Sequence, residues 1–186
     1  MTDIPTFKVL FYSRTANFNV GKIRQALARD PRIQLDLAFD IIRSPVLSTD
    51  ASKACGYISL PSNFEEFCKY DLIILGPSDF GAWTNAQIDG LRDFVIDRGG
   101  GLVLLPARDN SSLALLNNGK LGDLLPVIFD SRSERIWPPN KGRIELPEKY
   151  FEEPVLSEPD LRLLQTPTSA YYRILDTKPA ATVLAH

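Results

Sequence analysis

The sequence predicts an α/β fold of three layers (α/β/α), with helices on both faces of a mostly parallel central sheet. Leu72–Leu75 and Leu102–Leu105 are short, unbroken apolar runs, typical of parallel strands that are covered on both faces. Between them, Ile88, Leu91 and Phe94 recur at helical spacing and form one apolar face. This succession is a βαβ unit, whose crossover is right-handed in nearly all sheets.

Capping residues mark both ends of the predicted helix. Thr84 with Gln87 fits a capping box, in which the hydroxyl accepts from a helical amide and the glutamine side chain reaches back. Gly99 stands where a left-handed residue ends a helix at low cost. A phosphate-binding loop follows a strand and precedes a helix, whereas Gly99–Gly101 follows a helix. These glycines therefore predict a helix end and a tight turn.

The chain before this unit predicts two further strands with a helix between them. Phe7–Tyr12 is apolar and aromatic, as expected of a central strand, and a helix over Asn19–Arg29 follows. Ile33–Phe39 alternates apolar and polar residues. This period of two indicates a strand with one wetter face, nearer the edge of the sheet.

Residues 40–61 have no clear period. A loop of this length either covers the sheet or contains a short element. Ser62 with Glu65 predicts a second capping box, which opens a short helix that presents Phe64 and Phe67.

Two short helices are expected after the central unit, over Ser111–Asn117 and Lys120–Leu125. From residue 130 onward proline recurs between short strand-like pieces, such as Arg143–Leu146 and Thr182–Leu184. Proline is tolerated in edge strands, so these pieces are interpreted as possible edge strands.

We expect a single domain over residues 1–186. Its α/β core would span residues 1–129, and residues 130–186 would form an extended, proline-rich C-terminal section that packs on the core.

The composition is that of an ordinary globular protein, with 44% hydrophobic residues, 24% charged residues and a net charge of −2. This balance predicts no nucleic-acid partner and no anionic membrane footprint. No apolar run approaches the roughly 20 residues of a membrane helix, and no signal peptide is recognisable. We expect a soluble domain on the cytoplasmic or periplasmic side, with any membrane tether outside these residues.

The cysteines and the histidine predict no metal site. Cys55 and Cys68 are too few for a disulfide scaffold and lack metal-type spacing. We interpret them as buried free thiols, with a regulatory disulfide as the alternative. The only histidine, His186, is the last residue, whereas hydrolytic triads and most zinc sites need an imidazole held by its surroundings.

Candidate site residues follow from where ligands bind in open parallel sheets, which is beyond the carboxyl ends of the strands. Three loops should meet there, over residues 13–18, 77–83 and 106–111. Their polar residues form the candidate ligand-binding site: Ser13, Arg14, Thr15, Asn17, Ser78, Asp79, Arg108, Asp109 and Asn110. The alternative is that these are capping and turn residues that satisfy loop backbone groups.

Three features of these loops suggest roles. Arg108 and Asp109 could form a pair in which the guanidinium grips an anion and the carboxylate acts as a base, with a solvated surface pair as the alternative. Asp79 is the best-placed lone carboxylate because it follows a buried strand. Phe80 and Trp83 are interpreted as a loop anchor rather than a stacking platform.

Four stretches in order resemble the class I glutamine amidotransferase-like superfamily. They are KVLFYSRTANFNVGKIRQALARDPRI from residue 8, the unit from YDLIILG to FVIDRGGGLVLL, LGDLLPVIF from residue 121, and LDTKPAATVLA from residue 175. The resemblance covers most of the chain. It is to uncharacterised amidotransferase-like domains, commonly parts of larger bacterial membrane proteins that also carry a von Willebrand A-type domain. Trehalose-utilisation-like proteins are a related group.

The resemblance implies that this chain has the fold of the amidotransferase-like proteins but lacks their catalytic residues. Active amidotransferases carry a cysteine on the turn after the strand that here ends at Leu105, paired with a downstream histidine and an acid. In this chain the turn reads Pro106–Ala107–Arg108, and no internal histidine exists. Trehalose-utilisation-like proteins carry histidines where this chain has Asn19 and Pro106–Ala107.

We therefore expect a non-catalytic binding or interaction module with no cofactor, within a larger membrane-associated bacterial protein. Its partner would be an unidentified small molecule or protein, and a homo-oligomer stays open.

Two other functions stay open. The first is a flavodoxin-like FMN-binding protein, because Ser13–Asn17 and LGPSDFG resemble the two flavin-side loops. Ala16 and Phe18, however, stand where the flavodoxin phosphate loop has glycine and a hydroxyl residue. The second is a hydrolase or carbohydrate-active enzyme that uses Asp79 or Asp109 and needs a second carboxylate nearby.

Overall fold

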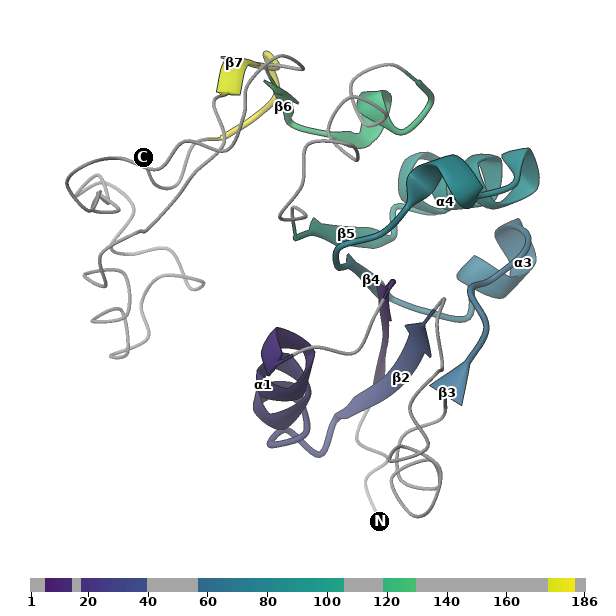
Figure 1. Cartoon of the computed structure of the whole chain (residues 1–186), viewed down its shortest axis with the longest axis vertical. Coiled ribbons are helices and arrows are strands. Elements are labelled where there is room, and N and C mark those ends of the chain that lie inside the picture. The colour runs from purple at the N-terminus through teal and green to yellow at the C-terminus, as the bar shows by residue number, and fades with distance from the viewer. Residues whose placement is uncertain (1–5, 15–17, 40–56, 106–118, 130–173, 183–186) are drawn as a thin grey trace, which may run out of the picture. The chain divides into compact units, whose positions relative to one another are not determined.

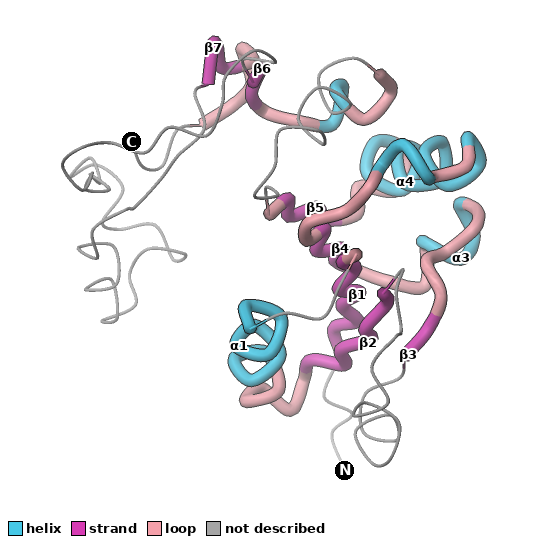
Figure 2. The backbone as a smooth tube through the Cα atoms, in the orientation of Figure 1, coloured by secondary structure: helices cyan, strands magenta, loops and turns pink. Residues whose placement is uncertain are grey.

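The computed structural model describes residues 6–14, 18–39, 57–105, 119–129 and 174–182. The chain forms two compact units, Met1–Leu124 and Leu125–His186. Helices and strands alternate along the first unit, as Figures 1 and 2 show.

The first unit is built on a five-stranded sheet in which every neighbouring pair is parallel. The spatial order is β3-β2-β1-β4-β5. The strands are β1 (Phe7–Ser13), β2 (Ile33–Phe39), β3 (Tyr57–Ile58), β4 (Leu72–Leu75) and β5 (Gly101–Leu104). The predicted α/β fold with a parallel sheet is confirmed, and β1 and β4 lie inside the sheet as expected. The full order β3-β2-β1-β4-β5 is the start of the Rossmann order, and without the two-residue β3 it also matches the start of the flavodoxin-like order.

One face of the sheet is covered by α1 (Phe18–Leu27), which Figure 1 shows on the side opposite α3 and α4. Val9 and Phe11 of β1 and Val20 of α1 are buried together in one apolar cluster. Ile23, one turn further along α1, packs against the same cluster. Because side chains alternate along a strand, Leu10, which lies between Val9 and Phe11, points to the other face.

The second face is covered by α3 (Phe64–Phe67) and α4 (Asn85–Ile96). Leu10 of β1 and Ile73 of β4 occupy matching positions in the register and are fully buried. Phe94 of α4 is also fully buried, and its ring centroid lies 6.5 Å from that of Phe67, which belongs to α3. Each such side chain contributes about 1.5–3 kcal/mol through burial.

Both ends of α4 have the predicted caps. The Thr84 hydroxyl accepts from the Gln87 amide at 3.3 Å, and the Gln87 side chain accepts from the Thr84 amide at 2.9 Å. At the other end Gly99 has a φ of 75°, a left-handed conformation that costs glycine little. Gly101 then starts β5, so the glycine run is a helix end and turn.

The predicted capping box of α3 was wrong by one residue. The N-cap is Asn63, whose side-chain oxygen accepts from the Glu66 amide at 3.0 Å. Ser62 instead donates from its amide and its hydroxyl to the Glu66 carboxylate, at 2.7 and 2.9 Å. Asparagine and serine are about equally good N-cap residues, and in the structure the helix begins after Asn63 and not after Ser62. Phe67 is buried, but Phe64 is exposed.

Three other predictions need correction. Leu102–Leu105 is not fully buried, because β5 is the outermost strand of the sheet among the described residues and Val103 is 41% exposed. The helix expected over 120–125 is a single 3-10 turn, η3 (Gly122–Leu124). The first helix starts and ends slightly earlier than predicted, because the turn into β2 begins after Leu27. The helix expected over 111–117 lies outside the described residues.

The second unit contains a separate two-stranded antiparallel sheet of β6 (Val127–Phe129) and β7 (Ile174–Thr177). Neither strand was predicted, because each is too short for its periodicity to stand out. The strand expected over 182–184 is not seen at Thr182, and its remaining residues lie outside the described part of the chain, as does the piece over 143–146. The division at residue 129 and the packing of the C-terminal section on the core stay predictions.

Gly90 lies where α4 approaches α3 most closely. A Cβ atom there would lie 2.8 Å from the Phe64 nitrogen and 2.9 Å from the Asn63 carbonyl carbon, which are backbone atoms that cannot move aside. Gly90→Ala should therefore lower the free energy of unfolding by about 1–3 kcal/mol. Gly21→Ala in α1 is the control, because nothing lies within 4 Å of its added Cβ, and it should stabilise by roughly 0.5–1 kcal/mol. Urea unfolding followed by circular dichroism measures both. Equal effects of the two substitutions would contradict this packing.

The turn between α1 and β2 contains a local ion pair. Arg32 donates to the Asp30 carboxylate from Nη2 at 2.6 Å and from Nε at 3.0 Å, and its amide donates at 2.9 Å. These hydrogen bonds, the side-chain ones foremost, lower the pKa of Asp30 to about 2. Because the folded-state pKa is the lower one, the contribution of this pair to stability is complete above about pH 4 and disappears as the pH falls toward 2.

Arg32→Gln should raise the pKa of Asp30 toward its ordinary value of 3.8. NMR titration of the Asp30 carboxyl carbon measures this, with Arg29→Gln as a control of equal charge change in the same segment. A shift of similar size in both variants would mean that general charge, and not the hydrogen bonds, sets the pKa.

Candidate functional site

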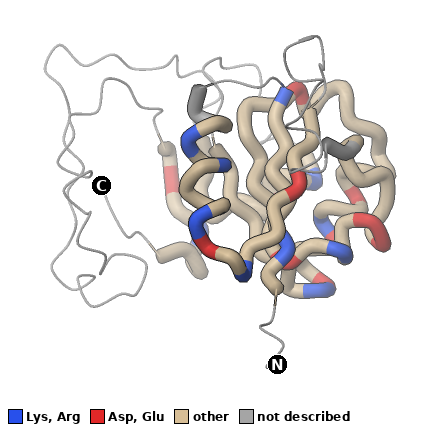
Figure 3. Tube along the Cα trace, turned by 90° about the horizontal axis from the view of Figure 1, so that it is seen from below, with Lys and Arg blue, Asp and Glu red and all other residues tan. Residues whose placement is uncertain are grey.

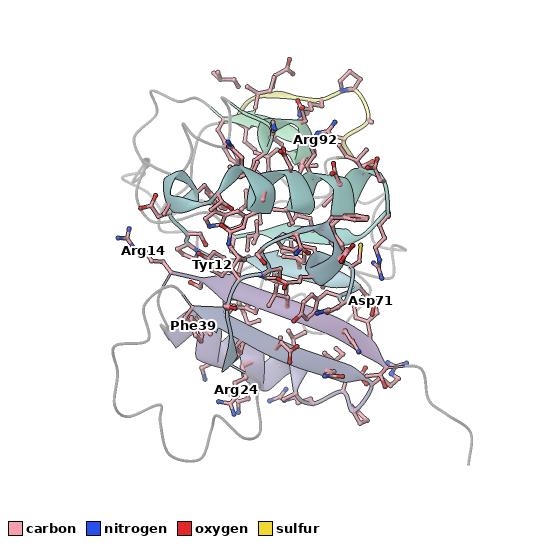
Figure 4. All side chains as sticks on the ribbon, turned by 90° about the vertical axis from the view of Figure 1, so that its right-hand side faces the viewer. Tyr12, Arg14, Arg24, Phe39, Asp71 and Arg92 are labelled. Atoms are coloured by element: carbon pink, nitrogen blue, oxygen red, sulfur yellow. The ribbon has the colours of Figure 1, made fainter. Side chains whose placement is uncertain are left out.

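The candidate site lies at the carboxyl end of the sheet, between β1 and β4. From β1 the chain proceeds outward to β2 and β3 on one side, and then returns to place β4 and β5 on the other. This reversal between β1 and β4 is a topological switch point, where the loops that leave two adjacent strands diverge. Figure 4 shows Arg14 at this end of the sheet and Asp71 at the opposite end.

Four of the nine predicted site residues lie in the described part of the chain, and the structure brings them together. Ser13 ends β1 and Arg14 follows it, while Ser78 and Asp79 follow β4. The other five lie outside the described residues: Thr15, Asn17, Arg108, Asp109 and Asn110. The proposed Arg108–Asp109 pair and any carboxylate partner of Asp79 on that loop therefore stay predictions.

The two strand exits approach each other closely. The Gly76 amide donates to the Tyr12 carbonyl at 2.7 Å, and the Arg14 amide donates to the Pro77 carbonyl at the same distance. A Cβ atom on Gly76 would lie 3.0 Å from Cβ of Ser13 and 3.2 Å from the Tyr12 carbonyl oxygen. An added Cβ would therefore require the end of β1 to give by a few tenths of an ångström.

Both serine hydroxyls of the site bond to backbone carbonyls. The buried Ser78 Oγ donates to the Gly76 carbonyl at 2.8 Å. Ser13 Oγ, also buried, donates to the Pro77 carbonyl at 3.3 Å. Ser78 thus bonds its own turn, as the turn interpretation expects, whereas Ser13 bonds the segment that leaves the neighbouring strand β4.

Arg14 and Asp79 are the exposed charges of the site. Arg14 Nη1 lies 3.8 Å from Asp79 Oδ2, and the two side chains are 54% and 45% exposed. At this distance the pair is loose and neither group is committed to the other, since exposed ion pairs contribute only about 0–1 kcal/mol. The guanidinium can therefore turn to an anionic group and the carboxylate to a donor or a cationic group.

Phe80 and Trp83 anchor the loop that carries Asp79. Both are buried, and their ring centroids lie 5.1 Å apart in an edge-on arrangement. Trp83 Nε1 donates to the Tyr12 hydroxyl at 3.2 Å. The prediction that these aromatic residues anchor the loop fits this burial. Sequence reasoning missed Tyr12, whose only signal was a polar aromatic residue near the end of a predicted strand.

The remaining polar contacts of the sheet lie away from this end. The Tyr70 hydroxyl donates to Asp36 Oδ2 at 3.1 Å, and burial first, with the Asp36 charge second, raises the pKa of Tyr70. Asp71 accepts from the Lys8 amide at 2.9 Å and pairs with Arg98 at 3.5 Å. These contacts join β2 to the segment after α3, and β1 to the end of α4, so their role is structural.

The described residues hold no group of three or more histidine, cysteine or acidic side chains that could bind a metal ion. Cys68 is a free thiol and is only half-buried, which corrects the expectation of a buried one, and Cys55 lies outside the described residues. Lys and Arg residues are interspersed with Asp and Glu residues along the described parts of the chain (Figure 3). Within the described ranges no helix has the length and apolar character needed to cross a membrane.

Comparisons with protein families, with curated proteins and with solved structures found no match to this chain.

Substitutions of the exposed charges of the site should change the stability of the fold much less than a substitution at Gly76. Arg14→Gln and Asp79→Asn should each change the free energy of unfolding by less than about 1 kcal/mol, because their pair is exposed and loose. Gly76→Ala should cost about 1–3 kcal/mol, because Ser13 is buried and cannot move away from the added methyl group. Chemical unfolding of the three variants tests this. A loss at Arg14 or Asp79 as large as that at Gly76 would mean that the charged pair is part of the folded framework.

Proposed function

We propose that this protein is a non-catalytic binding module that holds a charged group of a small molecule or partner protein at the β1–β4 switch point. The observation that carries the proposal is the loose, exposed Arg14–Asp79 pair at the place where open α/β sheets bind ligands. Arg14 would bind an anionic group, and Asp79 a donor or cation on the same ligand.

The sequence of the elbow after β5 argues against amide hydrolysis. Glutamine hydrolysis through a covalent intermediate needs a nucleophile and an adjacent base. Pro106–Ala107 provides neither, and the single histidine is the last residue of the sequence. Because the chain resembles amidotransferase-like domains, we further propose that it is part of a larger, membrane-associated bacterial protein. The full reading frame of the gene would test this.

FMN binding is the second candidate. The switch point between β1 and β4 favours it, because flavodoxin-like sheets bind FMN at such a point. Ala16 and Phe18 count against it, since they replace the glycine and hydroxyl residues of the flavodoxin phosphate loop. Flavin absorbance of the purified protein after soaking with FMN, followed by desalting, would distinguish this candidate.

The test of the proposal has a catalytic arm and a binding arm. Incubation with glutamine should release no ammonia. Release that survives the combined Cys55→Ala and Cys68→Ala substitutions would overturn the non-catalytic assignment. In the binding arm, isotope-labelled protein is titrated with L-glutamine, inorganic phosphate, FMN, a dicarboxylate and a diamine, and backbone resonances are followed. A ligand of the site should shift the Arg14 and Asp79 resonances.

Matched variants decide whether the response belongs to the site. Arg14→Gln and Asp79→Asn should each weaken binding at least about tenfold, because each removes a charge-assisted hydrogen bond. Lys120→Gln and Asp89→Asn are the controls, since they remove an equally exposed ion pair in the same unit. Equal loss in the control variants, or no response at Arg14 and Asp79 to any compound, would count against a small-molecule site here.

A further inference from the structure

The loop that carries Asp79 is attached at both ends to the last residues of β1. We propose that the side chains of Tyr12 and Trp83 form a latch that positions Asp79 against Arg14, so that the latch controls binding at the switch point. The proposal rests on the proposed function of that site and identifies the side-chain contact that would control ligand binding there.

The first attachment joins the start of the loop to β1. The Gly76 amide donates to the Tyr12 carbonyl, the Arg14 amide donates to the Pro77 carbonyl, and a Cβ atom on Gly76 would lie 3.0 Å from Cβ of Ser13. This attachment continues the β1–β4 ladder, so it depends on the sheet itself. It fixes the loop as far as Pro77, two residues before Asp79.

The second attachment joins the end of the loop to β1 through side chains. Trp83 Nε1 donates to the Tyr12 hydroxyl at 3.2 Å, and the two ring centroids lie 5.3 Å apart in an edge-on arrangement. Tyr12 is 1% exposed and Trp83 is 8% exposed. Phe80 packs on Trp83 from within the loop, so the indole joins the middle of the loop to β1 as well.

Asp79 lies between these two attachments. Its carbonyl accepts from the Ala82 amide at 3.0 Å, which ties it to η2 (Phe80–Ala82) and so to the latched end of the loop. Among the ion pairs of the described residues, its side chain takes part only in the loose contact with Arg14. The position of the carboxylate therefore depends on where the latch holds η2, since the exposed pair is too weak to hold the loop by itself.

Removing only the acceptor of this hydrogen bond should cost more than removing the donor and the acceptor together, and this difference makes the latch testable. No buried side-chain nitrogen or oxygen among the described residues lacks a hydrogen-bond partner. Removing the Tyr12 hydroxyl would leave the indole N–H buried without that acceptor, and an unsatisfied buried donor costs much more than the loss of a typical hydrogen bond. Removing both polar groups together also removes the indole donor, so the loop should close again on apolar contacts.

The experiment uses the full chain with Trp137→Phe, which leaves Trp83 as the only tryptophan. Amide hydrogen exchange is measured for the parent, Tyr12→Phe, Trp83→Phe and the double variant, and acrylamide quenching reports the exposure of Trp83 where it is present. In Tyr12→Phe, amides of residues 78–84 should exchange about tenfold faster or more, and quenching should rise. Exchange in α1 and β2 should not change. The double variant should return the loop toward the parent rate.

The binding arm separates positioning from folding. A compound that shifts the Arg14 and Asp79 resonances of the parent should bind Tyr12→Phe about fivefold more weakly or worse. Its affinity should recover in the double variant. Unchanged affinity in Tyr12→Phe overturns the positioning role. So does faster exchange spread evenly over α1, β2 and the loop, because that pattern is general destabilisation. If no compound binds the parent, the proposed function fails, and the exchange pattern alone decides whether the latch exists.

Discussion

The parallel pairing of β1 with β4 is the constraint on which the rest of the first unit depends. It aligns Leu10 with Ile73 and Tyr12 with Leu75, so that side chains on one face of both strands form the floor under α3 and α4. On the other face the same pairing places Phe11 beside Ile74, under α1. Because the ladder also continues into Gly76 and Pro77, it brings the two strand exits within hydrogen-bond distance. The fold and the candidate site therefore share one physical cause.

The site that results from this pairing contains two kinds of polar group. Ser13 and Ser78 are buried and bond to carbonyls of the loop, so they hold the backbone in place. Arg14 and Asp79 are exposed and weakly paired, so they are the groups that can exchange one partner for another at small cost. A rigid backbone that presents two weakly committed charges is suited to binding.

Tyr12 and Trp83 connect the buried framework to this exposed pair. A buried aromatic side chain that carries a polar atom usually needs a partner for that atom, and here the Tyr12 hydroxyl accepts from the Trp83 indole N–H. The loop after β4 is thereby held by side chains at its far end and by the sheet at its near end. Loops that carry binding groups are commonly positioned in this way by a rigid scaffold, which lowers the entropy lost when a ligand binds.

Sequence by itself determined the elements whose signals are local. The apolar run Leu72–Leu75, the capping box of Thr84 and Gln87, and the left-handed Gly99 each depend on neighbours within a few residues, and all three are present as predicted. Tertiary structure alone decided what depends on contacts between distant segments. The pairing of β6 with β7, the exposure of Val103 at the end of the sheet, and the 71-residue separation bridged by Trp83 and Tyr12 have no local signature. A hydrogen bond or a free strand edge is set by which segments the fold brings together, and no periodicity within either segment records that choice.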